Sequence, residues 1–281
     1  ASTGEPAHMI LGVDHIALSV ENIVDGVKLL DKFGLRAKFV QEGVPNHPAK
    51  RDFLKCYEPL HSIAYCQSEG SVSVELTQHS QPLCDALSPY QVLLKRGLSD
   101  TVAFIGDLSS WGKAWRASLG CIQPVAALSS LFHAQFWYDK RCDDLSSGFI
   151  RALLVPVTDL SVSEKFWVRG LGFRVANHGS ISGGRDWMHI TFRGPVQAWS
   201  LSLVLVDGSE AQPPHYLDDS GFPCLALISS RLNKDRELAL EMGSRGASSE
   251  FCLVVADNPL QIALLRGPDN ELVELIGFSP K

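Results

Sequence analysis

Hydrophobic residues along this chain follow two spacings that succeed one another in a fixed order. Near the start, strand-type residues occupy positions 10–20, and apolar residues then recur at helical spacing from 23 to 30, stopping at Gly34. Alternation in steps of two is typical of a β-strand, whereas recurrence in steps of three or four is typical of a helix. Residues 13–39 are therefore predicted to form a strand, a helix and a second strand.

The same order recurs along the chain. Two further strands at 61–67 and 71–79 complete a first unit of one strand, one helix and three strands. Later units are predicted to begin with strands at 100–108, 149–157 and 221–229. A repeat of roughly 60–75 residues is longer than solenoid periods, and one half-buried sheet is not stable alone. We therefore expect the four units to pair and to bury their sheets against one another.

The second unit is the least regular. Residues 81–97 are interpreted as a connection with helical character around 90–95, and the unit itself as a strand at 100–108 and a helix at 109–120, with further strands at 121–128 and 132–138. The third unit is clearer, because Ser161 and Glu164 have the spacing of a helix capping box.

A charged, turn-rich stretch at 139–148 is the predicted boundary between two halves. Residues 9–140 are expected to hold the first two units and 149–281 the last two, while 1–8 are expected to be a tag or disordered.

Composition excludes several classes of protein. With 281 residues, 45% of them hydrophobic, a net charge of −6 and no basic run, the chain has no electrostatic support for binding nucleic acid or an anionic membrane. Seven scattered cysteines without a C-x-x-C pair argue against a disulfide framework and a structural zinc site, so we expect a cytoplasmic protein with reduced thiols. No apolar run of membrane-spanning length and no leader segment is seen.

No nucleophile elbow, phosphate loop or dinucleotide fingerprint is present, so the sequence gives no support to a hydrolase, a kinase or a dehydrogenase.

Two motifs resemble those of a known superfamily. They are VDHIALSV at the start of the first unit and RGPDNELVEL at the end of the last. With the repeat, they resemble the vicinal-oxygen-chelate superfamily, which includes glyoxalase I, bleomycin-resistance proteins and extradiol dioxygenases. The resemblance implies an α+β fold in which four βαβββ modules pair into two curved mixed sheets around a cavity. It also implies metal ligands from the histidine of first strands and the glutamate of fourth strands.

Three positions of this sequence match those ligands. His15 occupies the first-strand position of unit one, while Glu75 and Glu274 occupy the fourth-strand positions of units one and four. The resemblance thus makes these three the candidate ligands of a divalent metal: Fe, Mn, Zn or Ni. The other three first strands depart from the pattern and carry Thr101, Ala152 and Cys224 at the histidine position.

Whether three ligands meet depends on which units pair. Alternation predicts that His15 points inward beside the small side chains of Ala17 and Ser19. Pairing of units one and two, or of units three and four, leaves each cavity short of ligands. Pairing of the first unit with the last would join His15, Glu75 and Glu274 with Cys224. The sequence leaves all three arrangements open.

Two functions follow from the resemblance. The first is a metal-dependent enzyme, either a lyase or isomerase or a ring-cleaving dioxygenase, that acts on a small oxygen-chelating or aromatic molecule. Glu75, Glu274 and His189 are its candidate catalytic residues. The alternative is a metal-free, resistance-type protein that sequesters a flat compound on Trp137, Trp187 and Trp199. Either would bind a small molecule rather than nucleic acid or a membrane, and a homodimer is the expected assembly.

Overall fold

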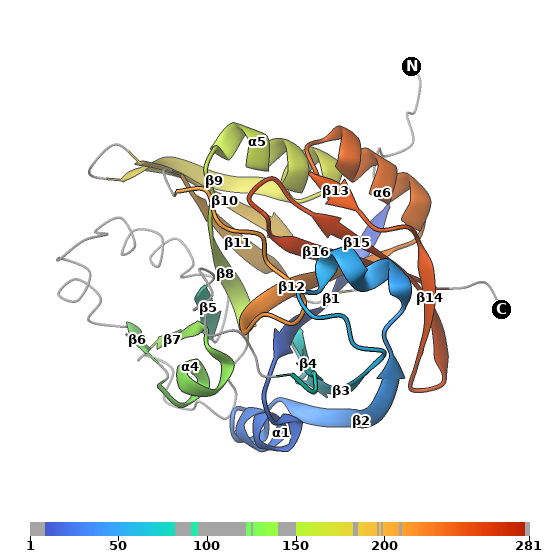
Figure 1. Cartoon of the computed structure of the whole chain (residues 1–281). Coiled ribbons are helices and arrows are strands. Elements are labelled where there is room, and N and C mark those ends of the chain that lie inside the picture. The colour runs from blue at the N-terminus through green and yellow to red at the C-terminus, as the bar shows by residue number, and fades with distance from the viewer. Residues whose placement is uncertain are drawn as a thin grey trace.

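The computed structural model describes two mixed β-sheets flanked by short helices (Figure 1). The described residues are 9–81, 91–94, 122–124, 126–139, 150–181, 185–195, 197, 199–207 and 210–278. The strands are β1 (Ile10–Ser19), β2 (Arg36–Pro45), β3 (Leu60–Gln67), β4 (Ser73–Gln78), β5 (Gln91–Leu94), β6 (Ile122–Pro124), β7 (Gln135–Asp139), β8 (Ile150–Pro156), β9 (Arg174–Ile181), β10 (Arg185–Phe192), β11 (Leu201–Val206), β12 (Gly221–Ser229), β13 (Gly246–Ala247), β14 (Phe251–Val255), β15 (Asn258–Arg266) and β16 (Leu272–Phe278). The helices are α1 (Ile23–Lys32), the 3-10 helix η1 (Pro48–Phe53), α4 (Ala126–Phe132), α5 (Leu160–Glu164) with its π-helical continuation η3 (Lys165–Gly170), and α6 (Leu232–Glu241). Within these ranges, no helix is long and apolar enough to cross a membrane.

The first and last units share one sheet. Its strand order is β13-β15-β16-β12-β1-β4-β3-β2, with β14 paired to β15. In both units the first strand runs parallel to the fourth, and the two units join where β1 pairs antiparallel with β12. The second sheet has the order β6-β7-β5-β8-β11-β10-β9. This architecture confirms the predicted α+β fold of modules paired into two curved mixed sheets, and of the three open pairings it shows the first unit with the last.

The sequence boundary expected at 139–148 lies almost wholly outside the described residues, so the division of the chain into two halves stays a prediction.

Local sequence explains where the helices begin. The Asn22 side chain caps α1 by accepting hydrogen bonds from the backbone N–H groups of Val24 and Asp25. The predicted capping box of the third unit is wrong. The side chain of Asp159, two residues earlier than expected, caps α5 by accepting from the N–H groups of Ser161 and Val162.

The second unit differs from its prediction. Residues 91–94 form the strand β5 where helical character was expected, and the strand expected over 121–128 is limited to β6. Pro124 cannot donate to a strand ladder, and Leu128 and Phe132 recur at helical spacing and are buried, so α4 forms instead. The strand at 100–108 and the helix at 109–120, with Thr101, lie outside the described residues.

The two faces of the first sheet carry different cores. Ile16 and Leu18 of β1 point away from the concave face and join a large buried cluster with α1, α4 and residues of the second sheet. Ala17, between them, joins a smaller cluster on the concave face with Ile63 and Cys224. This alternation confirms the predicted facing of the first strand.

A buried acidic pair connects the C-terminal turn to α5. The Asp269 carboxylate accepts hydrogen bonds of 2.7–2.9 Å from the backbone N–H and hydroxyl of Thr158 and from the Ser163 hydroxyl. The Asp269 N–H donates to Glu271 Oε2, whereas Glu271 Oε1 has no partner in the described part of the chain. Burial, and then the neighbouring Asp269, raise the pKa of Glu271 from 4.5 to about 8. Glu271 is therefore largely protonated in the folded protein at neutral pH.

We predict that Glu271 makes the protein less stable as the pH rises from 4.5 to 8. Over this window the folded protein keeps the proton of Glu271 and the unfolded chain does not, so each pH unit lowers the free energy of unfolding by at most about 1.4 kcal/mol. Glu271→Gln keeps an acceptor for the Asp269 N–H but does not titrate, so it should lose this slope. Urea unfolding of both proteins near the two ends of the window measures it, and equal slopes would contradict the prediction.

Candidate functional site

The concave face of the first sheet encloses a cavity of about 280 Å³. Its polar lining residues come mainly from the first unit, with Asn258 and Glu274 from the last unit. Its apolar lining residues come mainly from the last unit, with Phe39 and Ile63 from the first unit. The polar residues are Asp14, His15, Lys38, Lys50, His61, Tyr65, Gln67, Glu75, Asn258 and Glu274, and the apolar ones are Phe39, Ile63, Leu253, Val255, Ala256, Leu260, Ile262, Ile276 and Phe278.

Strand register places the candidate ligands on two neighbouring rows across the sheet. In one row, Glu274 pairs with Ala226 and Ala226 with His15. In the next row, Cys224 pairs with Ala17 and Ala17 with Glu75. Each glutamate is therefore separated from the first-strand position of the other unit by one alanine. Because alanine has the smallest side chain after glycine, space remains between the larger polar groups.

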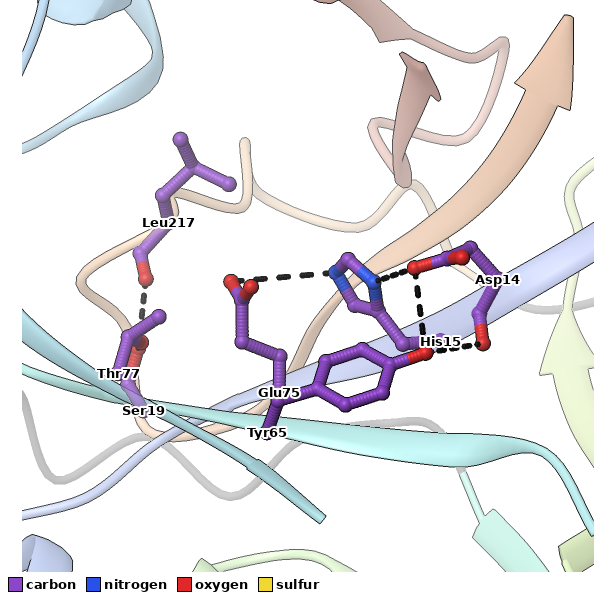
Figure 2. A network of polar contacts seen from close by, with 7 residues as sticks. All are labelled: Asp14, His15, Ser19, Tyr65, Glu75, Thr77 and Leu217. Carbon is purple, nitrogen blue, oxygen red and sulfur yellow. Dashed lines mark hydrogen bonds and ion pairs between the residues drawn. The ribbon is translucent and has the colours of Figure 1, made fainter. Parts of the chain in front are cut away.

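His15 is buried and oriented by its neighbour. Its Nδ1 lies 2.7 Å from Asp14 Oδ2, and its Nε2 lies 3.8 Å from Glu75 Oε1 without a hydrogen-bond partner within the described ranges. Figure 2 shows the imidazole between these two carboxylates, with the Tyr65 hydroxyl near Asp14. The sequence predicted His15 and Glu75 but gave no indication of Asp14.

A β-bulge explains how Asp14 reaches the ring of the next residue. Adjacent residues of a regular strand point to opposite faces, but the β1–β12 register shifts between Val13 and His15. The Gln197 side chain accepts from the Val13 N–H at 3.2 Å and donates to the Val13 carbonyl at 2.7 Å. Gln197, in the loop between β10 and β11, therefore fixes the backbone directly before the bulge, and this helps to hold Asp14 beside His15.

Three carboxylates set the charge of this wall. Burial alone would lower the pKa of His15, but Glu75, Asp14 and then Glu274 raise it to about 9. Burial opposes ionisation of Asp14, yet its contacts with His15 hold its pKa below the usual value. Glu274 is half-buried, and desolvation outweighs the attraction of His15, so its pKa is raised. Without a bound cation, His15 is thus protonated at neutral pH.

Several residues of the site were missed by sequence reasoning. Lys50 lies on η1, inside a stretch that shows no strand or helix periodicity, and its ammonium lies 5.9 Å from the centre of the Phe251 ring. Phe39 and Tyr65 stack with ring centroids 5.7 Å apart and both line the cavity. Alternation along β2 and β3 could have indicated that these two side chains share a face.

The other residues that the sequence suggested for the site either do not line this cavity or are not reactive. His189 is on β10 of the second sheet, where its Nε2 contacts the Ser202 hydroxyl at 2.9 Å, and it does not line the cavity. Trp187 and Trp199 do not line it either, and the Trp137 side chain lies outside the described parts of the structure. Cys224 is buried, and its pKa is raised well above 9 by desolvation, so it stays a thiol.

The imidazole and carboxylate side chains of this site are of the types that bind divalent ions. The Nε2 of His15 is buried without a hydrogen-bond partner and faces Glu75, and an outer carboxylate on Nδ1 is what metal-bound histidines commonly have. As the side chains stand, no three histidine, cysteine or carboxylate groups of the described residues are arranged to hold an ion. His15 Nε2 and Glu75 Oε1 lie 3.8 Å apart, and Glu274 lines the same cavity.

Comparison with known proteins supports the fold. No protein-family model and no curated protein matches the sequence. Glyoxalase I from Zea mays aligns over 96% of this chain and 92% of its own with 14% identity and a TM-score of 0.54, and a single-residue variant of it over the same shares with 15% identity and a TM-score of 0.56. A candidate dioxygenase from Bacillus subtilis aligns over 97% and 87% with 11% identity and a TM-score of 0.53. The chain therefore has the fold of glyoxalase I, which is the fold that the sequence predicted.

We predict that Gln197→Ala lowers the free energy of unfolding and loosens the contact between Asp14 and His15. Loss of two hydrogen bonds to the Val13 backbone should cost about 1–3 kcal/mol in the free energy of unfolding. The pKa of His15, followed by NMR, should also fall, because Asp14 is no longer held against the ring. Gln212→Ala removes a solvent-exposed side-chain hydrogen bond and serves as the control. An unchanged His15 pKa in Gln197→Ala would contradict the role given to the bulge.

Proposed function

We propose that this chain is a divalent-metal-dependent enzyme that acts on a small molecule bearing two neighbouring oxygen atoms. Its metal ligands are His15, Glu75 and Glu274, and the substrate occupies the cavity of the first sheet. Fe, Mn, Zn and Ni are the candidate ions, because one imidazole and two carboxylates suit them. The reaction is of the lyase, isomerase or ring-cleaving dioxygenase type.

The observation that carries this proposal is the buried Nε2 of His15. A polar atom removed from water without a hydrogen bond costs about 1–3 kcal/mol. Here it lies 3.8 Å from Glu75 Oε1, and the neighbouring strand positions carry the small side chains of Ala17 and Ala226. The vicinal-oxygen-chelate fold agrees with such a site, although the fold alone does not assign a reaction.

Different residues of the chain would have different roles in the reaction. A bound ion would act as a Lewis acid toward the two substrate oxygens. Asp14 would hold the His15 ring in the orientation that leaves Nε2 toward the cavity. A carboxylate that lines the cavity, such as that of Glu274, would accept a proton from the substrate and return it. The apolar wall of Leu253, Ile262 and Ile276 would exclude water from the substrate.

A metal-free binding function is the second candidate. His15 and Glu75 already form an ion pair, and the raised pKa of His15 shows that the carboxylates stabilise its protonated form. In this case the stacked Phe39 and Tyr65, rather than the tryptophans, would contact a flat ligand. The two functions differ in whether any ion binds the purified protein.

We predict that chelator-treated protein binds one divalent ion per chain. Calorimetric titration with Fe²⁺, Mn²⁺, Ni²⁺ and Zn²⁺ should give a stoichiometric transition for at least one ion, and His15→Gln and Glu75→Gln should each weaken it by at least about 100-fold because a ligand is lost. Glu69→Gln, on the exposed turn after β3, should leave binding unchanged. If none of the four ions binds to the folded protein, the enzyme proposal fails and the metal-free function is favoured.

We further predict that Asp14→Asn lowers the affinity for this ion by about 10- to 100-fold, as loss of an outer hydrogen-bond partner does in metal sites. The asparagine keeps an acceptor for Nδ1 but removes the charge that makes the imidazole a better donor. Asp25→Asn, on the exposed face of α1, is the matched control. Equal affinities of wild type and Asp14→Asn would show that Asp14 does not support the site.

A further inference from the structure

A second, smaller cavity adjoins the main one. Its volume is about 30 Å³, enough for a single small group, and four of its lining residues also line the main cavity: Lys50, His61, Glu75 and Glu274. The rest of its wall consists of Ala17, Asn46, Leu54, Thr77, His79 and Leu217. The Ser19 hydroxyl donates to the Leu217 carbonyl at 2.6 Å and lies 3.1 Å from the Thr77 hydroxyl, which fixes the loop before β12 against this inner cavity (Figure 2).

Polar groups without partners face this inner cavity. Asn46 is 4% exposed and its Nδ2 has no hydrogen-bond partner, and His79 is 8% exposed with an unpartnered Nδ1. The Lys50 ammonium lies within 4.0 Å of no carboxylate of the described residues, and Lys50 lines both cavities. An amide N–H and an ammonium that line one small cavity are donors that require an acceptor. Nothing in the described chain supplies that acceptor.

Charge indicates which acceptor fits. Glu75 and Glu274 also line the inner cavity, but in the function proposed above their two negative charges are balanced by the divalent ion. The ammonium of Lys50 is then a positive charge that no carboxylate in the lining of the inner cavity balances. A bound water would satisfy the hydrogen bonds but not this charge, whereas a carboxylate would satisfy both.

We propose that the inner cavity binds the carboxylate of the substrate through Lys50 Nζ and Asn46 Nδ2. This proposal rests on the proposed metal-dependent function. The two neighbouring oxygens of the substrate are then a carboxylate oxygen and the hydroxyl or carbonyl oxygen on the adjacent carbon. Because the main cavity has an apolar wall of Leu253, Leu260 and Ile262, the rest of the molecule is a small apolar group. The substrate class is therefore a 2-hydroxy or 2-oxo acid with an apolar side chain.

Mandelate and its methyl ester test this proposal, because they differ only in the group assigned to the inner cavity, which is a carboxylate in the first and a larger, uncharged ester in the second. Calorimetry on the metal-loaded protein should show that mandelate binds at least about tenfold more tightly than methyl mandelate, the size expected for a hydrogen bond to a charged group. Lys50→Met should abolish this preference and Lys50→Arg should retain part of it. Lys28→Met removes the same charge from the exposed face of α1, outside both cavities, and should leave the preference intact.

Each result decides the proposal. Equal affinities for acid and ester, no binding of either at millimolar concentration, or an unchanged preference in Lys50→Met would overturn it and leave water as the occupant of the inner cavity. A preference lost equally in Lys28→Met would also overturn it, because the preference would then reflect the net charge of the protein rather than a contact with Lys50. Binding of a divalent ion is measured separately, so a protein that binds metal without this preference refutes the carboxylate site alone. A Lys50-dependent preference in protein that binds no ion would refute the metal proposal instead.

Discussion

The antiparallel pairing of β1 with β12 is the interaction on which the cavity depends. It joins strands from opposite ends of the chain, from Ile10 opposite Ser229 to Ser19 opposite Gly221. Bringing such distant segments together costs loop-closure entropy, which must be offset by burial on both faces of the sheet. On one face Ile16 and Leu225 enter the large core, and on the other Ala17 enters the concave cluster. Without this pairing, Glu274 would not share a wall with His15.

The small residues at the centre of that pairing make the site possible. Ala17 and Ala226 are buried, and each lies between two polar or ionisable side chains in its row. Leucine in place of Ala226 would put a larger side chain between His15 and Glu274. A strand pair that is otherwise rich in valine, isoleucine and leucine thus leaves one region uncovered, and the polar groups line it.

The sequence predicted the order of strands and helix in the first, third and fourth units, the facing of His15 and the strand positions of Glu75 and Glu274, because strand alternation and repeat alignment depend only on local pattern. The sequence did not predict which units share a sheet. The first strands of all units have similar apolar patterns, so any two of them could pair side by side. The bulge at Asp14 depends on the register with β12 and on Gln197, so it became visible only with the tertiary structure. Lys50 was missed for a related reason: it lies on a 3-10 helix whose position is fixed by packing rather than by periodicity.

The unpartnered atoms around the two connected cavities bear on what the protein was selected to do. Asn46 Nδ2, His79 Nδ1 and His15 Nε2 are all buried without hydrogen bonds among the described residues. At about 1–3 kcal/mol each, they cost several kcal/mol in a protein whose total stability is about 5–15 kcal/mol. Apolar side chains at these positions would remove that cost without disturbing the strand pairing. Bound ligands that form hydrogen bonds with these three atoms would remove this cost, and the adjoining cavities are also lined by Lys50, Glu75 and Glu274.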